Sequence, residues 1–226
     1  MVQTARKRGA EVGSGFQEAL NRTNEAYEKA GIACITRKAI PGKYIMPKET
    51  KRRGLTLPNV EALAGFQTGA RVRSDDLQSL LKTNRSDPRA FVPESRGEPD
   101  YGGCLAPQGR AIYYDAKSTK REQLDFDNLH PHQVAYLERT AAVGAVAGFL
   151  VEFAAHNRVY FLPIQVLVRF RAITTRKSIP YRFFEAHLIP VKPGKGLLIH
   201  DYLQAIREQE TKYGTDFAGL PMNAVS

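Results

Sequence analysis

The sequence PD at residues 99–100, followed at residues 115–117 by DAK, decides the fold of this chain. The residues between these two motifs predict strands at about 101–104 and 110–117, separated by a turn with the sequence Pro-Gln-Gly. A hairpin of these strands would return the chain to its start and bring the first aspartate near the second. Because residues two apart on a strand share a face, the second aspartate and the lysine point to the same side. The pattern therefore predicts two carboxylates and an ammonium group at one place.

Two carboxylates at one place, Asp100 and Asp115, repel each other unless a cation lies between them. Oxygen-only ligation suits Mg²⁺, with Mn²⁺ as a substitute. Such an ion can position and activate a water and neutralise charge on a scissile phosphate, and Lys117 would stabilise the same oxyanion. Hydrolysis of a phosphodiester is the matching reaction. The alternative is a solvated hairpin with a surface ion pair, since two acids and a lysine also reach this spacing by chance.

The charge balance favours a polyanionic partner. The 226 residues include 33 Lys and Arg against 23 Asp and Glu, which gives a net charge of +10 and favours nucleic acid through counterion release. An apolar run long enough to span a bilayer is absent, and no apolar stretch follows the basic N-terminus, so we expect a soluble, cytoplasmic protein without a membrane partner. The two cysteines, Cys34 and Cys104, belong to no C-x-x-C pair. They indicate neither a zinc site nor a disulfide framework.

Apolar spacing along the rest of the chain predicts alternating helices and strands. We expect a flexible basic tail at residues 1–14, followed by a single nuclease domain at 15–226 in which residues 43–97 form an insertion. The predicted elements are a helix at 15–30, a strand at 32–36, one or two helices between 60 and 83, a helix at 132–140 capped by Asp127 or Asn128, strands at 148–153 and 159–163, a helix at 164–171, a loop at 176–180 and a helix at 203–213. This order is typical of an α/β fold.

Several segments, in the same order, resemble the RecU family of Holliday junction resolvases along nearly the whole chain. The strongest block consists of DYGG at 100–103, GR at 109–110, YDAKSTK at 114–120 and HPHQ at 130–133. Further matching segments are NRTNEAY at 21–27, VYFLP at 159–163 and KSI at 177–179. The resemblance implies a restriction-endonuclease-like core, with a central mixed β-sheet flanked by helices and residues 43–97 as a projecting stalk.

The resemblance also implies a role for each residue of the site. Asp100 and Asp115 would bind the metal, Lys117 would stabilise the transition state, and Gln133 would complete the metal shell from the following helix. The family usually has glutamate at the position of Asp115. Aspartate is one methylene shorter but still ligates, so the departure does not exclude activity.

Two further positions depart from the family pattern. Glu98 replaces a threonine, and it could add a metal ligand or only a surface charge. The acid of the family's first helix falls on Gln17, with Glu18 next to it, so Glu18 is a candidate catalytic residue. Helical geometry explains Glu18 equally well as part of a solvated face, because it lies about 200° round the helix from Phe16 and Leu20.

Basic residues in the insertion and in one later loop are candidate phosphate contacts. They are Lys48, Lys51, Arg52, Arg53, Arg71, Arg73, Arg176 and Lys177. Tyr44, Phe66 or Phe91 could stack on unpaired bases, although an aromatic side chain is more often part of a core. His130 and His132 could suggest a pair of metal ligands, but histidines two apart at a helix start do not share a face, and Mg²⁺ prefers oxygen ligands. We therefore expect these two histidines to cap a helix or to contact phosphate.

The resemblance implies that a homodimer nicks four-way DNA junctions symmetrically in recombination and repair. Recombinase and branch-migration proteins are further candidate partners. Two alternatives stay open. One is a related nuclease without junction selectivity, and the other is a noncatalytic junction-binding or recombinase-modulating protein that has kept the fold.

Overall fold

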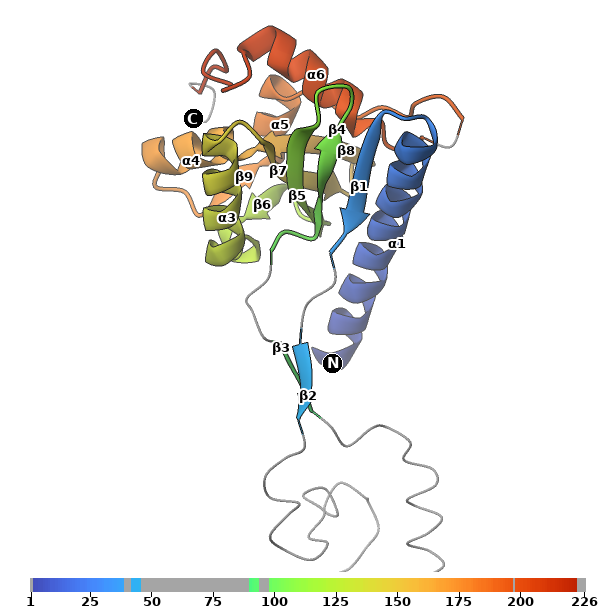
Figure 1. Cartoon of the computed structure of the whole chain (residues 1–226). Helices are drawn as coiled ribbons and strands as arrows, with labels where there is room; N and C mark the ends of the chain where they lie inside the picture. The colour runs from blue at the N-terminus through green and yellow to red at the C-terminus, as the bar shows by residue number, and fades with distance from the viewer. Residues whose placement is uncertain (1, 39–41, 46–89, 94–97, 197, 223–226) are drawn as a thin grey trace, which may run out of the picture. The chain divides into compact units, whose positions relative to one another are not determined.

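A five-stranded sheet forms the centre of the larger unit in this computed structural model, which describes residues 2–38, 42–45, 90–93, 98–196 and 198–222 (Figure 1). The larger unit is Met1–Ala39 with Gly97–Ser226, and the smaller is Ile40–Arg96. In the smaller unit the described residues are two antiparallel strands, β2 (Gly42–Ile45) and β3 (Ala90–Pro93). The bounds of this unit lie close to those expected for the insertion, whose predicted helices fall outside the described residues.

The sheet of the larger unit is mixed, as predicted. Its strands, in spatial order, are β1 (Ala33–Arg37), β4 (Tyr101–Leu105), β5 (Arg110–Thr119), β7 (Val146–Phe153) and β8 (Arg158–Pro163). Strands β5 and β7 run parallel, and the other neighbouring pairs run antiparallel. Parallel strands need a long crossover, which here contains α3 (Pro131–Ala142). Strands β4 and β5 form the predicted hairpin.

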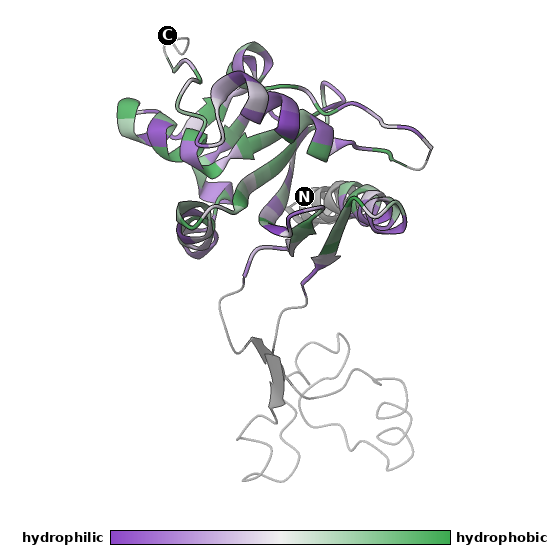
Figure 2. Cartoon of the chain, turned by 45° about the horizontal axis from the view of Figure 1, so that its top comes forward, coloured by the Kyte–Doolittle hydropathy of each residue, from purple (hydrophilic) through white to green (hydrophobic). Residues whose placement is uncertain are grey.

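Helices pack on both faces of this sheet. One face is covered by α1 (Val2–Lys29) and α6 (Tyr202–Tyr213), and the other by α3, α4 (Ile164–Ile173) and α5 (Tyr181–His187). Side chains alternate between the two cores along β7, where Phe149 and Val151 face α3 and Leu150 faces α1. Figure 2 shows the hydrophobic colour concentrated along the central strands. The predicted α/β sheet flanked by helices is therefore confirmed.

Some element boundaries differ from the predictions. Helix α1 begins at Val2 and so includes residues 2–14, contrary to the prediction of a flexible tail. That stretch is rich in Ala, Arg, Lys, Gln and Glu, which favour helix. Helix α3 has His130 at its N-cap, whereas Asp127 and Asn128 lie in a separate turn of 3₁₀-helix, η3 (Phe126–Asn128). No helix among the described residues is both long and apolar enough to cross a lipid bilayer.

The segment after α4 also departs from the prediction of a loop. Its residues Ser178–Pro180 form β9, which pairs antiparallel with β6 (Gln123–Asp125). Helix α5, which was not predicted, begins directly after Pro180. A strand of three residues carries almost no local signal, so only its distant partner makes it recognisable.

Candidate metal and catalytic site

The two aspartates of the motif lie opposite each other across the β4–β5 hairpin. Because Tyr101 pairs with Tyr114 in the hairpin register, Asp100, one residue before β4, comes opposite Asp115. The backbone N–H of Asp100 donates a hydrogen bond of 2.8 Å to Asp115 Oδ1. The Asp100 carbonyl in turn accepts one of 2.8 Å from the N–H of Lys38, just after β1. The hairpin thus brings the two acids together, as the sequence predicts.

Lys117 and Gln133 complete a polar cluster around Asp115. Lys117 Nζ lies 2.9 Å from Asp115 Oδ2 and donates a hydrogen bond of 3.2 Å to Gln133 Oε1. The Asp115 side chain is 0% exposed and that of Lys117 is 17% exposed. Gln133 lies in the first turn of α3 and is also buried. The crossover helix between β5 and β7 therefore delivers an amide oxygen to the acid-bearing hairpin.

The electrostatics of the cluster fit a divalent cation. Burial, together with repulsion from Asp115, raises the pKa of Asp100, and attraction to Lys117 offsets only part of this. Asp115 Oδ2 is buried, and its partner among the described residues is the Lys117 ammonium, which leaves the repulsion between the two carboxylates only partly offset. A Mg²⁺ or Mn²⁺ ion would relieve that repulsion, and two carboxylates with an amide oxygen are suitable ligands for it.

Glu98 and Glu18 lie apart from this cluster. Within the described part of the chain, no three Asp, Glu, His or Cys side chains come close enough to share a metal ion, so neither glutamate joins the two aspartates. Glu98 is exposed and forms an ion pair with Lys38. Glu18 is exposed on α1, 2.6 Å from the guanidinium of Arg22. Their positions fit the surface-charge alternative that the sequence left open.

The two histidines before Gln133 are arranged differently from the prediction. The rings of His130 and His132 stack nearly parallel, with centroids 5.6 Å apart, so the two side chains do lie together. His130 occupies the N-cap position of α3, but its side chain makes no capping hydrogen bond. Its predicted capping role is therefore wrong, and contact with phosphate stays a prediction for both.

Two of the predicted phosphate contacts fall within the described residues. Arg176 and Lys177 are exposed in the loop between α4 and β9. The Lys177 carbonyl accepts a 2.9 Å hydrogen bond from the N–H of Phe126, which fixes this loop beside η3. The other candidates fall outside the described residues, namely Lys48, Lys51, Arg52, Arg53, Arg71, Arg73 and the aromatic Phe66.

A buried tyrosine network, which sequence reasoning missed, supports the hairpin from its other face. Tyr101 and Tyr114, the chain neighbours of the two acids, stack with centroids 4.8 Å apart. The Tyr101 hydroxyl donates to Asn21 Oδ1 (3.0 Å) on α1, and burial raises its pKa to about 12. The Tyr114 hydroxyl contacts Asn24 of α1 and Tyr202 of α6. Helices α1 and α6 thereby hold the strands that carry the acids.

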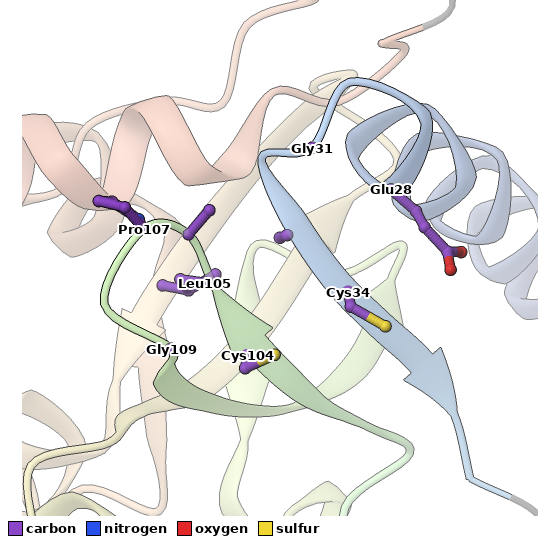
Figure 3. Close-up of a pocket in the computed structure, with 9 residues that line it drawn as sticks. Glu28, Gly31, Cys34, Cys104, Leu105, Pro107 and Gly109 are labelled. Carbon is purple, nitrogen blue, oxygen red and sulfur yellow. The ribbon is translucent and has the colours of Figure 1, made fainter.

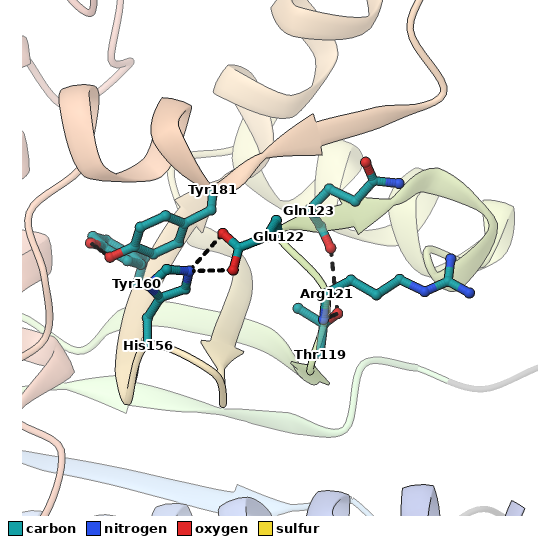
Figure 4. Close-up of polar contacts among 7 residues, drawn as sticks. All are labelled: Thr119, Arg121, Glu122, Gln123, His156, Tyr160 and Tyr181. Atoms are coloured by element: carbon teal, nitrogen blue, oxygen red, sulfur yellow. Dashed lines mark hydrogen bonds and ion pairs between the residues drawn. The ribbon is translucent and has the colours of Figure 1, made fainter. Parts of the chain in front are cut away.

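A second set of polar contacts stabilises the C-terminal end of β5, two residues after Lys117 (Figure 4). The Thr119 hydroxyl accepts a 3.0 Å hydrogen bond from the N–H of Arg121, which turns the chain toward β6. Glu122 then lies 2.7 Å from His156 Nε2 in the β7–β8 turn. The His156 ring stacks face to face on Tyr181 of α5, with centroids 3.7 Å apart. These contacts limit the movement of the strand segment that carries Lys117.

Comparison with known proteins identifies the family. The family model described as Recombination protein U matches residues 80–208, which is more than half of the chain. The chain is also 26% identical over 204 residues to the Holliday junction resolvase RecU of Streptococcus pneumoniae strain Hungary19A-6, covering 89% of this chain and 86% of the relative. The proteins of the same name from strains P1031 and G54 are 26% and 25% identical over the same length. Both comparisons confirm the resemblance seen in the sequence, and the chain belongs to the Recombination protein U family.

Proposed function

We propose that this protein is a metal-dependent endonuclease that resolves four-way DNA junctions. The observation that carries the proposal is the cluster of Asp100, Asp115, Lys117 and Gln133, in which two neighbouring carboxylates repel each other beside one ammonium group and one amide oxygen. The similar proteins of Streptococcus pneumoniae are named Holliday junction resolvase, which supports the choice of substrate. The net charge of +10 is consistent with a DNA partner.

Each residue of the cluster has a distinct chemical task in this proposal. The carboxylates of Asp100 and Asp115 and the amide oxygen of Gln133 would hold Mg²⁺ or Mn²⁺. When bound, the ion would lower the pKa of a water and neutralise charge on the scissile phosphate. The Lys117 ammonium, 2.9 Å from Asp115 Oδ2, is positioned to donate to a phosphate oxygen as negative charge develops on it. Its hydrogen bond to Gln133 orients both side chains.

Symmetric resolution of a junction also requires a second site. Two strands of like polarity must be cut, which a homodimer with twofold symmetry can do with one site in each copy. We therefore propose a homodimer as the active form, with recombinase and branch-migration proteins as further partners. Sedimentation of the protein on a synthetic junction should give two chains per junction.

The decisive measurement compares cleavage of a synthetic four-way junction with cleavage of a linear duplex of matched sequence. We expect Mg²⁺-dependent nicks at symmetric positions in two strands of the junction and much slower cleavage of the duplex. Equal rates on the two substrates would leave a nuclease without junction selectivity. Junction binding without any metal-dependent nicking would instead favour the noncatalytic alternative.

Substitutions in the cluster separate chemistry from binding. We expect Asp100→Asn and Lys117→Ala each to slow junction cleavage by about a hundredfold or more, because each removes a group that acts on the reacting phosphate. Junction affinity should change little, since binding rests on many phosphate contacts. The exposed Asp127→Asn change is the matched control and should cleave normally. An equal loss of affinity and cleavage in the cluster variants would contradict these roles.

The exposed pair Arg176 and Lys177 offers a test of the DNA-binding surface. Replacing both by alanine should lower the slope of log affinity against log salt concentration by about 2, because each phosphate contact releases about one counterion. Lys195→Ala, which also removes an exposed positive charge, is the control and should leave the slope unchanged. A slope that changes equally in both variants would show that only net charge matters.

A further inference from the structure

Two cysteines that are far apart in the sequence lie directly opposite each other in the sheet. Cys34 of β1 is the register partner of Cys104 of β4. Both are free thiols, and both are exposed. Figure 3 shows the two side chains at the same level of the neighbouring strands. Directly opposed residues of an antiparallel pair project to the same face, so both thiols lie on one side of the sheet.

The environment of the two thiols leaves them open to small reagents. Along β1, Ala33 and Ile35 are buried whereas Cys34 is exposed, so Cys34 points away from the core under α1. Among the described strands, β1 lies at one edge of the sheet. A cavity of about 290 Å³ lies beside the thiols and is lined by Cys34, Cys104, Leu105 and Pro107 among others. A small disulfide can therefore reach either sulfur.

The backbone pattern defines the spacing of the two cysteines. The N–H of Lys38 bonds to the carbonyl of Asp100, and the N–H of Ala106 bonds to that of Ile32. Both pairs lie an even number of residues from the cysteines, so Cys34 and Cys104 form a hydrogen-bonded pair with Cα atoms about 5.5 Å apart. That Cα separation is near the usual one for disulfides. The Cβ atoms of directly opposed strand residues lie farther apart than those of a disulfide, so they must approach to about 4 Å.

We propose that Cys34 and Cys104 form a reversible disulfide by exchange with a small-molecule disulfide such as oxidised glutathione. One cysteine thiolate attacks a glutathione sulfur, which forms a mixed disulfide and releases one glutathione thiolate. The other cysteine thiolate then attacks the protein sulfur, forms the Cys34–Cys104 bond and releases the second glutathione thiolate. The protein dithiol is oxidised, one glutathione disulfide is reduced to two thiols, and both cysteine protons end on glutathione. The approach of the Cβ atoms strains the bond, so reduced glutathione should reopen it readily.

The disulfide would close a covalent ring that contains the whole of the smaller unit. Residues 40–96 lie between the two cysteines in the sequence, and β1 and β4 are the strands at which the chain leaves and re-enters the larger unit. The bond would also tie β1 to the strand that begins one residue after Asp100. A ring of this size restricts the unfolded chain, so oxidation should raise the melting temperature by several degrees. This inference does not depend on DNA cleavage.

Mass spectrometry tests the proposal on the full chain. The reduced protein is incubated at pH 8 with glutathione buffers of increasing oxidised fraction, quenched with acid, alkylated and digested with trypsin. We expect the peptides 30–37 and 97–110 to appear joined by a disulfide, and an excess of reduced glutathione to separate them. In Cys34→Ser and Cys104→Ser, the remaining cysteine should instead carry one glutathione. Two glutathiones on each wild-type chain, or two alkylated thiols in every buffer, would overturn the proposal.

A register control keeps the number of thiols constant. Thr36 is exposed on the same face of β1, two residues from Cys34. The double change Cys34→Ser with Thr36→Cys places the second thiol diagonally from Cys104, about 7–8 Å away, which is too far for a disulfide without movement of the backbone. This variant should acquire glutathione on both cysteines and should show no rise in melting temperature on oxidation. Ring closure as efficient as in the wild type would show that the opposed register is not responsible.

Discussion

Asn24 is the residue on which the buried network behind the acid-bearing hairpin depends. Its Nδ2 donates to the Tyr114 hydroxyl over 3.0 Å, and its Oδ1 accepts from the Tyr202 hydroxyl over 2.5 Å. All three side chains are buried. In a medium of low dielectric constant, satisfied polar groups specify one arrangement, and unsatisfied ones are costly. One amide of α1 thus joins the strand that carries Asp115 to α6.

Replacement of Asn24 should therefore destabilise the fold. We expect Asn24→Ala to lower the free energy of unfolding by about 3 kcal/mol, because it leaves two buried hydroxyls with fewer partners and opens a small cavity. The exposed Asn128→Ala change should cost less than about 0.5 kcal/mol. Urea unfolding measures both, with the midpoint shifting at constant slope. Similar midpoints for the two variants would argue against a stabilising network.

At the scale of elements, the pairing of β1 with β4 depends on a close approach of the two backbones. A Cβ built on Gly103 would lie 1.9 Å from the Cys34 carbonyl oxygen and 2.7 Å from Ile35 Cα. Neither backbone atom can move aside unless the strands separate. Gly109, in the β4–β5 turn, has a φ of +71° but open space around it. The two glycines are thus required for different reasons, one by packing and one by backbone conformation.

Alanine at these two positions should have unequal effects. Gly103→Ala should lower the free energy of unfolding by about 3 kcal/mol or more, since overpacking against backbone forces β1 away from β4. Gly109→Ala should cost only about 1–2 kcal/mol, the usual cost of a left-handed conformation for a residue with a Cβ. Melting temperatures report the difference, with the Gly103 variant the lower of the two. The reverse order would mean that β1 is not closely paired in solution.

At the scale of the whole molecule, one buried and one half-buried histidine make stability depend on pH. Burial lowers the pKa of His200, and burial with repulsion from Lys212 lowers the pKa of His187. The unfolded chain therefore binds protons more readily at these positions than the folded chain does. By linkage, the free energy of unfolding falls as the pH is lowered through the unfolded-state pKa of about 6.5. Asp100 has a raised pKa and contributes in the opposite direction.

We accordingly expect the melting temperature to fall between about pH 7.5 and 5.5. The double change His187→Gln with His200→Gln should flatten this decline, because the groups that take up protons on unfolding are removed. His132→Gln removes an exposed histidine and should keep the full decline. Scanning calorimetry across the range is the measurement. A decline that persists unchanged in the double variant would assign the effect to other groups.

The sequence by itself determined the acid-bearing hairpin and the order of most elements. Three local patterns carried this prediction, namely the strand alternation, the turn at residues 107–109 and the two-residue spacing of Asp115 and Lys117. Local patterns can be recognised without knowledge of the rest of the fold. Gln133 was reached only through the family resemblance. Nothing in its own neighbourhood distinguishes it from a surface amide.

Only the tertiary structure decided which distant segments meet. It bonds the Gln133 amide to Lys117, pairs β6 with β9, gathers three tyrosines and Asn24 behind the acids, and sets Cys34 opposite Cys104. It also directs Glu18 and Glu98 to basic neighbours at the surface. The physical reason is that strand register and helix packing are set by burial across the whole core, and a stretch of sequence carries no record of its partner.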